Sequence, residues 1–255
     1  MPEYPQSLVP AGSVAPAPRR VRAVLAGRTV LDTVRARYVW EWPPYPQYYV
    51  PLADVDTSLL LDEGTSEQTP RGTARHAALV VGDVHRPGAA ALHGADAPEQ
   101  LRDTVRFEWS ALDAWFEEDE EVFVHPRNPY ARVDAVRSTR HVRVELDGVV
   151  LAESGAPVMV FETGLPPRTY FPRSAVDSTH LVPSTTRTQC PYKGHTSAYW
   201  SVEVGGTVHP DLAWSYDFPT RDVLPIAGMV AFFDEKVDVV VDGQRQERPH
   251  TPFSD

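Results

Sequence analysis

The sequence has few of the residues on which disulfide, metal and nucleic-acid sites depend. Its single cysteine excludes an internal disulfide, and no set of cysteine and histidine residues has zinc-finger spacing, so we expect neither a metal nor a cofactor. Lys and Arg together number 24 against 35 Asp and Glu, and the basic residues form no cluster. This charge balance argues against a nucleic-acid partner.

Long apolar segments are also absent. No run approaches the ~20 apolar residues needed to span a bilayer, and residues 1–20 contain proline and glycine but no apolar leader. A free thiol is typical of a reducing compartment. We therefore expect a cytoplasmic protein without a membrane partner, and we interpret residues 1–20 as a flexible N-terminal segment. The sequence leaves the oligomeric state open.

What the chain does have is proline, 25 in 255 residues, and an internal repeat. The prolines favour short segments and firm turns over long helices. Residues 21–42 align without gaps to residues 142–163, which is the signature of a duplicated unit. Identities at this offset are Val21, Arg22, Leu25, Gly27, Glu41, Pro46, Tyr49, Pro51, Val55, Asp56 and Leu60, matched by Val142, Arg143, Leu146, Gly148, Glu162, Pro167, Tyr170, Pro172, Val176, Asp177 and Leu181.

Each copy opens with the pattern of a β-hairpin. "VRVELDGVV" (142–150) alternates apolar and polar residues on both sides of an Asp-Gly pair, which favours a tight primed turn. "YWSVEVGGTV" (199–208) repeats the pattern around Gly-Gly, and "KVDVVVDGQ" (236–244) gives another strand that ends at a turn. The sequence therefore predicts a mainly β protein with two tandem, small antiparallel β domains.

The repeat also sets the expected domain bounds. We place the first copy at residues 21–130 and the second at residues 140–248, with a boundary near 127–140. One segment of the first copy breaks the repeat. "SALDAWFEED" (110–119) begins with a serine suited to an N-cap and has Leu112, Trp115 and Phe116 at helical spacing. It predicts a short helix inserted into the first copy.

The second copy resembles a family known as domain of unknown function DUF427, which is sometimes labelled nucleotidyltransferase-like. The first copy resembles the leading half of the tandem subgroup of that family. The resemblance implies a mostly β domain of tent- or barrel-like form and implies little about activity. It rests on "VRVELDGVVLAES" (142–154), "FETGLPPRTYFP" (161–172), "CPYKGHTSAYWSV" (190–202), "LAWSYDFP" (212–219) and "IAGMVAFFDEKVDV" (226–239). The chain has no glycine-serine phosphate cradle and no paired carboxylates of the kind that nucleotide transfer requires.

The repeat gives an internal comparison for site residues. Glycines and strand valines recur in both copies, whereas a thiol, a lysine and several aromatics occur only in the second. The differing segments are "QCPYKG" (189–194) against "QTPRG" (68–72), "AYW" (198–200) against "RHA" (75–77), and "AWSYDFP" (213–219) against the glycine and alanine of "GAAALHGAD" (88–96). Residues needed only for folding would be needed twice, so these residues are candidates for a function specific to the second copy.

Cys190 and Lys193 are the first candidates. A nearby cation stabilises a thiolate and makes it a usable nucleophile, and Lys193 lies within reach if Pro191 turns the chain. The alternative is that Cys190 packs as a small buried hydrophobe, as many lone cysteines do. The residues alone leave both interpretations open.

Glu162 and Arg168 flank the proline-rich loop of the second copy. Glu162 ends the apolar strand "VMVFE", where partial desolvation suits an acid/base group or a ligand clamp. Glu41 occupies the same place in the first copy, which favours a structural role for both glutamates. Arg168 faces Gln47, and it either pairs with an anionic substrate or is a solvated loop residue.

The aromatic residues of the second copy complete the predicted site. Alternating aromatics in strands more often belong to a core than to a binding wall. We expect Trp200 and Trp214 to pack, and Tyr192 and Tyr216 to lie at a pocket rim. Tyr170 is matched by Tyr49 and so has the same two interpretations as Glu162.

The leading hypothesis is an enzyme that acts on a small polar molecule in the second domain. Cys190 would be the nucleophile, Lys193 would hold its thiolate, and Glu162 would act as acid/base. Substrate contacts would come from Arg168, Tyr170, Tyr192, Trp214 and Tyr216. The first alternative is a non-catalytic module that binds a small ligand, and the second is nucleotide transfer, as the family label suggests.

Overall fold

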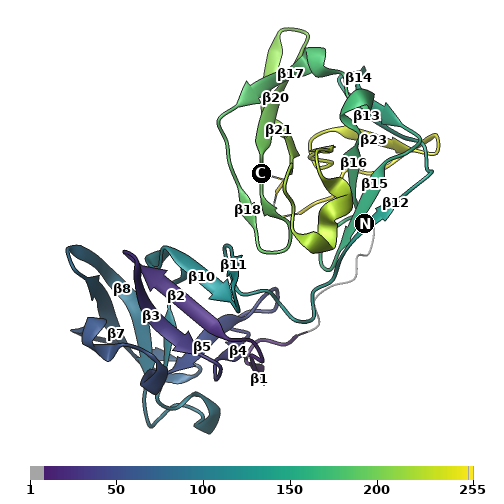
Figure 1. Ribbon diagram of the computed structural model, residues 1–255. Coiled ribbons are helices and arrows are strands. Elements are labelled where there is room, and N and C mark those ends of the chain that lie inside the picture. Colours follow the sequence, from purple (N-terminus) through teal and green to yellow (C-terminus); the bar gives the residue numbers. More distant parts are fainter. Residues whose placement is uncertain (1–8, 252, 255) are drawn as a thin grey trace. The chain divides into compact units, whose positions relative to one another are not determined.

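The computed structural model describes residues 9–251, 253 and 254 of the chain. The chain divides between Pro129 and Tyr130 into two compact domains. Within the described residues, each domain contains one seven-stranded and one four-stranded antiparallel sheet. Figure 1 draws the first domain in purple to teal and the second in green to yellow. The predicted mainly β class and the tandem organisation are confirmed.

The first domain has the strand orders β1-β4-β5-β9-β8-β7-β6 and β11-β10-β2-β3. The larger sheet consists of β1 (Val14–Pro16), β4 (Arg37–Val39), β5 (Gln47–Pro51), β9 (Thr104–Phe107), β8 (Val84–His93), β7 (Gly72–Val81) and β6 (Leu60–Thr69). The smaller sheet consists of β11 (Glu120–Val122), β10 (Ala114–Glu117), β2 (Val21–Leu25) and β3 (Arg28–Thr33).

The second domain has the strand orders β12-β15-β16-β22-β21-β20-β17 and β14-β13-β23-β24. The larger sheet consists of β12 (Val133–Arg137), β15 (Val158–Glu162), β16 (Arg168–Phe171), β22 (Val230–Phe232), β21 (Thr207–Ser215), β20 (Ala198–Val204) and β17 (Leu181–Ser184). The smaller sheet consists of β14 (Val149–Ser154), β13 (Val142–Leu146), β23 (Asp238–Val241) and β24 (Gln244–Arg245). A separate pair is formed by β18 (Gln189–Cys190) and β19 (Gly194–His195).

The two domains repeat each other in the strand order of both sheets and in several irregularities. The repeated features are the register shift at Ala23/Val24 and Val144/Glu145, and the isolated bridge Leu31–Val55 and Ala152–Val176. Shared defects of this kind place equivalent residues without relying on sequence identity. The register therefore gives a residue-by-residue alignment of the two domains.

The predicted hairpin turns are confirmed. Asp147 and Gly148 have φ of 49° and 81°, Gly205 and Gly206 have 58° and 80°, and Asp242 and Gly243 have 52° and 80°. Positive φ at both central residues is the geometry of the primed two-residue turn, and its twist matches that of the flanking strands. Asp-Gly and Gly-Gly occupy these turns because few other pairs adopt positive φ twice without strain.

The predicted helix over 110–119 is wrong. The segment contains the 3₁₀ turn η4 (Trp109–Ala111), then strand β10, and a turn at Glu118 that leads to β11. Trp115 and Glu117 are buried and Phe116 between them is partly exposed, so the true period is two. The segment is the counterpart of β23 in the second domain, because Trp115 pairs with Ala23 as Val239 pairs with Val144.

The helical elements of the described residues are 3₁₀ turns: η1 (Leu52–Asp54), η2 (Thr57–Leu59), η3 (Glu99–Leu101), η4, η5 (Arg173–Ala175), η6 (Ser178–His180) and η7 (Arg221–Ile226). Across the described part of the chain, no helix has the length and apolar character required to cross a membrane. The predicted flexible segment 1–20 lies partly outside the described residues. Within it, residues 14–16 form β1, which pairs with β4.

The main core of each domain lies between its two sheets. Alternate residues of β13 face inward, and Val142, Val144 and Leu146 are buried against Phe171 of the larger sheet. The other face of that sheet in the second domain carries a separate apolar cluster, which includes Tyr170 and Ile226 of η7. Because consecutive strand residues alternate, Tyr170 and Phe171 belong to opposite faces.

Candidate functional site

The only cysteine of the chain lies in a small hairpin of the second domain. Cys190 pairs with Gly194 across β18 and β19, and its side chain is partly exposed. Gly194 has a φ of 92°, which lets the chain return tightly enough to hold Lys193 in the turn. The hairpin therefore presents a thiol and an ammonium from one short loop.

Lys193 forms an ion pair with Glu162 at the end of β15. Its Nζ donates to Glu162 Oε2, and the two side chains are only 14 % and 12 % exposed. Burial by itself lowers the pKa of Lys193, but nearby Cys190 and Glu162 outweigh burial, so the pKa lies above its ordinary value. Lys193 therefore keeps its positive charge at neutral pH. The structure thus brings together the three residues predicted as catalytic.

Tyr170 is buried close to this ion pair. Glu162, Lys193, Tyr170 and Trp214 together form the Tyr170 network. Its hydroxyl accepts a hydrogen bond from Trp214 Nε1 at 3.2 Å, and burial raises the pKa of Tyr170 to about 12. Burial also raises the pKa of Tyr216, whose hydroxyl interacts electrostatically with Tyr170 and Cys190. Trp214 and Tyr216 are 7 % and 4 % exposed. Trp214 thus packs as expected, whereas Tyr216 lies in the core behind the thiol.

Arg168 has its partners inside the protein. Its guanidinium makes bidentate hydrogen bonds to Glu235 at 2.8 and 3.0 Å and approaches Asp234 at 3.3 Å. It also lies over the Trp214 ring, 5.5 Å from the ring centroid. Arg168 is therefore neither a solvated loop residue nor a free anion clamp. Neither acidic partner was identified from the sequence.

Tyr192 is the most peripheral of the predicted binding residues. It lies in the turn between β18 and β19 and is partly exposed. Its backbone carbonyl accepts a hydrogen bond from the Thr220 hydroxyl, which ties the hairpin to the segment before η7. Tyr192 is thus the predicted binding residue that shares the hairpin of Cys190 and is partly exposed.

The first domain contains an equivalent network. The Tyr49 hydroxyl donates to Glu41 at 2.7 Å and accepts from Arg71 Nε at 2.8 Å, while Arg71 lies 3.6 Å from Glu41. A carboxylate, a tyrosine and a cation therefore occur at the same positions in both domains. Thr69 replaces Cys190 there, and its hydroxyl donates to Gly72 O at 2.8 Å to close the turn.

The sheet register corrects one part of the sequence comparison. Leu92 faces Val105 as Ser215 faces Val230, so Tyr216 is equivalent to His93 and not to glycine or alanine. His93 is buried and packs against Tyr49, with ring centroids 5.1 Å apart. His93 was not predicted as a network residue, although it lies within the aligned segment 88–96. Features confined to the second domain thus include the thiol, Tyr192, Trp200, Trp214 and the Tyr216 hydroxyl.

Two hollows occupy equivalent places in the two domains. One, of about 200 Å³, is lined by Leu52, Thr57, Leu60 and Ala77 among others. The other, of about 180 Å³, is lined by their counterparts Arg173, Ser178, Leu181 and Trp200, among others. Arg173 lies over the Trp200 ring, 5.4 Å from its centroid, so a cation and an indole narrow the second hollow. Neither hollow includes Cys190, Lys193 or Glu162.

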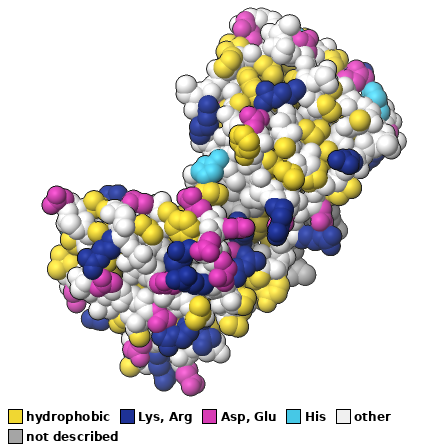
Figure 2. Space-filling model, in the orientation of Figure 1, with side chains coloured by type: hydrophobic (Ala, Val, Ile, Leu, Met, Phe, Trp, Pro, Cys, Tyr) yellow, Lys and Arg dark blue, Asp and Glu magenta, His cyan; other side chains and the backbone are white. Residues whose placement is uncertain are grey.

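Acidic and basic side chains lie intermixed over the face of the first domain that Figure 2 shows. Within residues 9–251, 253 and 254, no group of three or more histidine, cysteine, aspartate or glutamate side chains is placed to hold a metal ion.

Comparison with known proteins adds one relationship. The family described as "Domain of unknown function (DUF427)" matches residues 13–118 and 134–243, one match in each domain. A search of the curated proteins finds no match.

Proposed function

The chain belongs to the DUF427 family as two tandem copies, and on that premise we propose that its second domain is an enzyme for a small polar substrate, with Cys190 as nucleophile. The single observation that carries the proposal is the partly exposed thiol beside the buried Lys193–Glu162 pair. A cation next to a thiol favours the thiolate, which is the nucleophilic form.

The comparison between domains supports a chemical role for the thiol. Thr69 closes its turn with a hydroxyl that donates to a carbonyl, and the Arg71 N–H donates to that hydroxyl at 3.0 Å. A thiol is a poor substitute in such bonds because it is a weak donor and a weak acceptor. Turn closure therefore favours threonine and gives no reason for Cys190, whereas nucleophilic chemistry does.

The proposed step is a group transfer to sulfur. The Cys190 sulfur attacks an acyl carbon of the substrate, a C–S bond forms to give a thioester, and the bond to the leaving group breaks. The thiol proton passes to the Glu162 carboxylate and then to the leaving group. The Lys193 ammonium offsets the negative charge on sulfur, and Tyr192 contacts the substrate at the rim. Water then hydrolyses the C–S bond and restores the thiol.

p-Nitrophenyl acetate is a suitable probe because attack by sulfur releases coloured p-nitrophenolate and leaves an acetyl group on the protein. We expect a burst of p-nitrophenolate and one acetyl group at Cys190, detected by peptide mass. Cys190→Ala removes the burst, while circular dichroism confirms that the variant folds. Equal hydrolysis by wild type and a folded Cys190→Ala variant contradicts the nucleophile role.

A second candidate function is a module that binds a small ligand without catalysis. It is favoured by the recurrence of carboxylate, tyrosine and cation in both domains, since a set present twice does not depend on a thiol. Under this alternative, Cys190→Ala keeps ligand affinity and a folded protein shows no acetyl transfer. The acetylation experiment therefore separates the two functions.

A further inference from the structure

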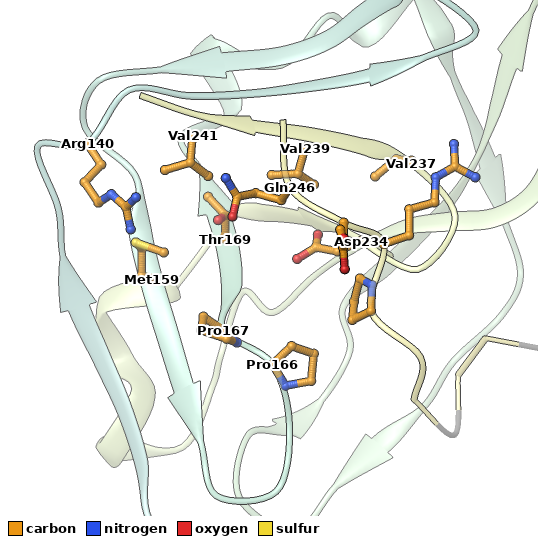
Figure 3. Close-up of a pocket in the computed structure, with 13 residues that line it drawn as sticks. Arg140, Met159, Pro166, Pro167, Thr169, Asp234, Val237, Val239, Val241 and Gln246 are labelled. Carbon is orange, nitrogen blue, oxygen red and sulfur yellow. The ribbon is translucent and has the colours of Figure 1, made fainter. Parts of the chain in front are cut away.

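The core of the second domain is partly open between its two sheets. A hollow of about 150 Å³ lies between Met159 of β15, Thr169 of β16 and Val239 of β23, with Asp234 at one side. Figure 3 shows these side chains around the hollow, together with Gln246 from the C-terminal segment that covers it. Thr169 and Tyr170 alternate along β16, so this hollow lies on the opposite face of the sheet from the Tyr170 network.

The register of the repeat identifies what fills the same space in the first domain. Four aromatic side chains take the places of smaller residues there. The pairs are Tyr38 and Met159, Tyr48 and Thr169, Trp115 and Val239, and Trp109 and Asp234. Trp109 and Asp234 each lie two positions beyond the equivalent strand residues Phe107 and Phe232. The rings stack, with centroids 5.7 Å apart for Tyr38–Tyr48, 5.8 Å for Tyr48–Trp115 and 4.8 Å for Trp109–Trp115.

The backbone of this fold is therefore able to hold flat rings between its sheets. In the second domain the rings are gone, the strand register is kept, and the space remains. A cavity of about 150 Å³ holds one six-membered ring, as an engineered cavity of that size in another protein binds benzene. The hollow thus has room for a single ring of the kind that the first domain supplies from its own chain.

Four charged residues line the hollow: Arg140, Arg248, Asp234 and Glu247. Arg140 pairs with Asp242 and Arg248 pairs with Asp238, so each arginine already has a carboxylate partner. The carboxylate of Asp234 is less fully paired, and it favours a cation.

Asp234 and Glu235 are two carboxylates beside one guanidinium, that of Arg168, and the three side chains are at most 13 % exposed. Arg168 makes its bidentate hydrogen bonds to Glu235. Its contact with Asp234 is longer, 3.3 Å, so Asp234 is the less tightly paired of the two carboxylates. Of these three groups, Asp234 is the one that lines the hollow.

The first domain offers a parallel for a carboxylate that meets a ring-borne donor in this space. The Tyr48 hydroxyl donates to Glu117, which is 3 % exposed and also forms an ion pair with Arg19. A charge-assisted hydrogen bond of this type is stronger than a neutral one. The second domain has the carboxylate of Asp234 in a similar setting but no ring from its own chain.

We propose that this hollow is a binding site for a small molecule with one flat aromatic ring and a protonated amine or amidine. The ring lies between Met159, Thr169 and Val239, and the cationic group donates to Asp234. The site is distinct from the Cys190 site and does not depend on it.

Benzamidine, benzamide and acetamidine test the proposal on the full chain by isothermal titration. Benzamidine and benzamide share one shape and differ in charge, whereas acetamidine has the charge without the ring. We expect benzamidine to bind with a Kd on the order of 0.1–1 mM. We expect benzamide and acetamidine to bind at least about tenfold more weakly.

Two variants test separately how the free volume of the hollow and the charge of Asp234 contribute to benzamidine binding. Val239→Trp fills the hollow with the first domain's residue and abolishes binding, while Val208→Trp at a surface position 53 % exposed leaves it unchanged. Asp234→Asn keeps the shape and lowers benzamidine affinity by about tenfold to a hundredfold. If Val239→Trp fails to fold, Asp234→Asn decides alone. Absence of saturable benzamidine binding, equal affinity for benzamide, or binding unchanged by Asp234→Asn overturns the proposal.

Discussion

Replacing Asp234 by asparagine should change the pH dependence of stability in a defined window. Burial raises the pKa of Asp234 from 3.8 to about 6, with Arg168 opposing the shift and Glu235 adding to it. The folded state therefore binds this proton more tightly than the unfolded state does. The stabilisation from this group is complete below about pH 4 and is lost as the pH rises through about 6.

The size of the effect follows from the shift. A difference of about 2 pKa units at 1.36 kcal/mol each gives about 3 kcal/mol over the whole titration. Between pH 4 and pH 7 the loss is about 2 kcal/mol, because the unfolded-state carboxyl is already partly ionised at pH 4. Asparagine has no such titration. The free energy of unfolding of Asp234→Asn minus that of wild type should therefore rise by about 2 kcal/mol over this range. Effects of the substitution that do not depend on pH cancel in that comparison.

The assay is urea unfolding of both proteins at several pH values from 4 to 7, with the second-domain transition followed separately. The midpoint of the Asp234 carboxyl resonance in a carbon NMR titration gives an independent measure and should lie near 6. A stability difference that is constant with pH, or that falls as the pH rises, refutes the reasoning about burial and charge at this position.

Two further predictions concern stability. Lys193→Met leaves the buried Glu162 carboxylate without its cation and should lower the free energy of unfolding by about 3–5 kcal/mol. Arg71→Met should lower the free energy of unfolding by less in the same denaturation measurement. The contact of Arg71 with Glu41 is longer, 3.6 Å, and the Tyr49 hydroxyl still donates to Glu41 in the variant. Equal losses of stability in the two variants contradict this prediction. Gly72→Ala should reduce the melting temperature more than Gly194→Ala, since an added Cβ meets Ala97 backbone at 3.0 Å in the first case and nothing closer than 3.8 Å in the second. A larger drop in melting temperature for Gly194→Ala than for Gly72→Ala contradicts this prediction.

The regular parts of the fold were predictable because their signals are local. Asp147-Gly148 and Gly205-Gly206, each between alternating strands, specify tight hairpins from a few neighbouring residues. The ungapped repeat carried that information from one half of the chain to the other. Lys193 pairs with Glu162, and Cys190 lies in the same hairpin as Lys193, at a turn and a strand end that recur in both copies of the repeat. The catalytic roles of these residues stay a prediction.

The wrong predictions have two causes. One is a pattern read over too few residues, and the other is an interaction between residues far apart in the sequence. Leu112, Trp115 and Phe116 fit a helical spacing over one turn, but they belong to a 3₁₀ turn and a strand, and the pairing of Trp115 with Ala23 across the sheet decides between the two. A period read over so few residues cannot separate them.

The partners of Arg168 lie more than sixty positions away in the sequence, at Asp234 and Glu235, and no local pattern connects them. The hollow in the core of the second domain could not be predicted for the same reason, because the residues that line it are far apart in the sequence. Trp109 and Asp234 become equivalent only after the strands on both sides are aligned, and the wrongly placed helix obscured that alignment. Tertiary pairing, and not local preference, decided each of these cases.

The most direct test of the proposed enzyme is the rate at which iodoacetamide alkylates Cys190 at pH 7, followed by intact mass. Because Cys190 is the only cysteine, each added group reports on that thiol alone. Cys190 should react faster than glutathione, and Lys193→Gln should slow the reaction by about tenfold or more. Lys236→Gln, at the only other lysine, should leave the rate unchanged. A rate no faster than glutathione, or one that Lys193→Gln does not alter, contradicts the nucleophile role of Cys190.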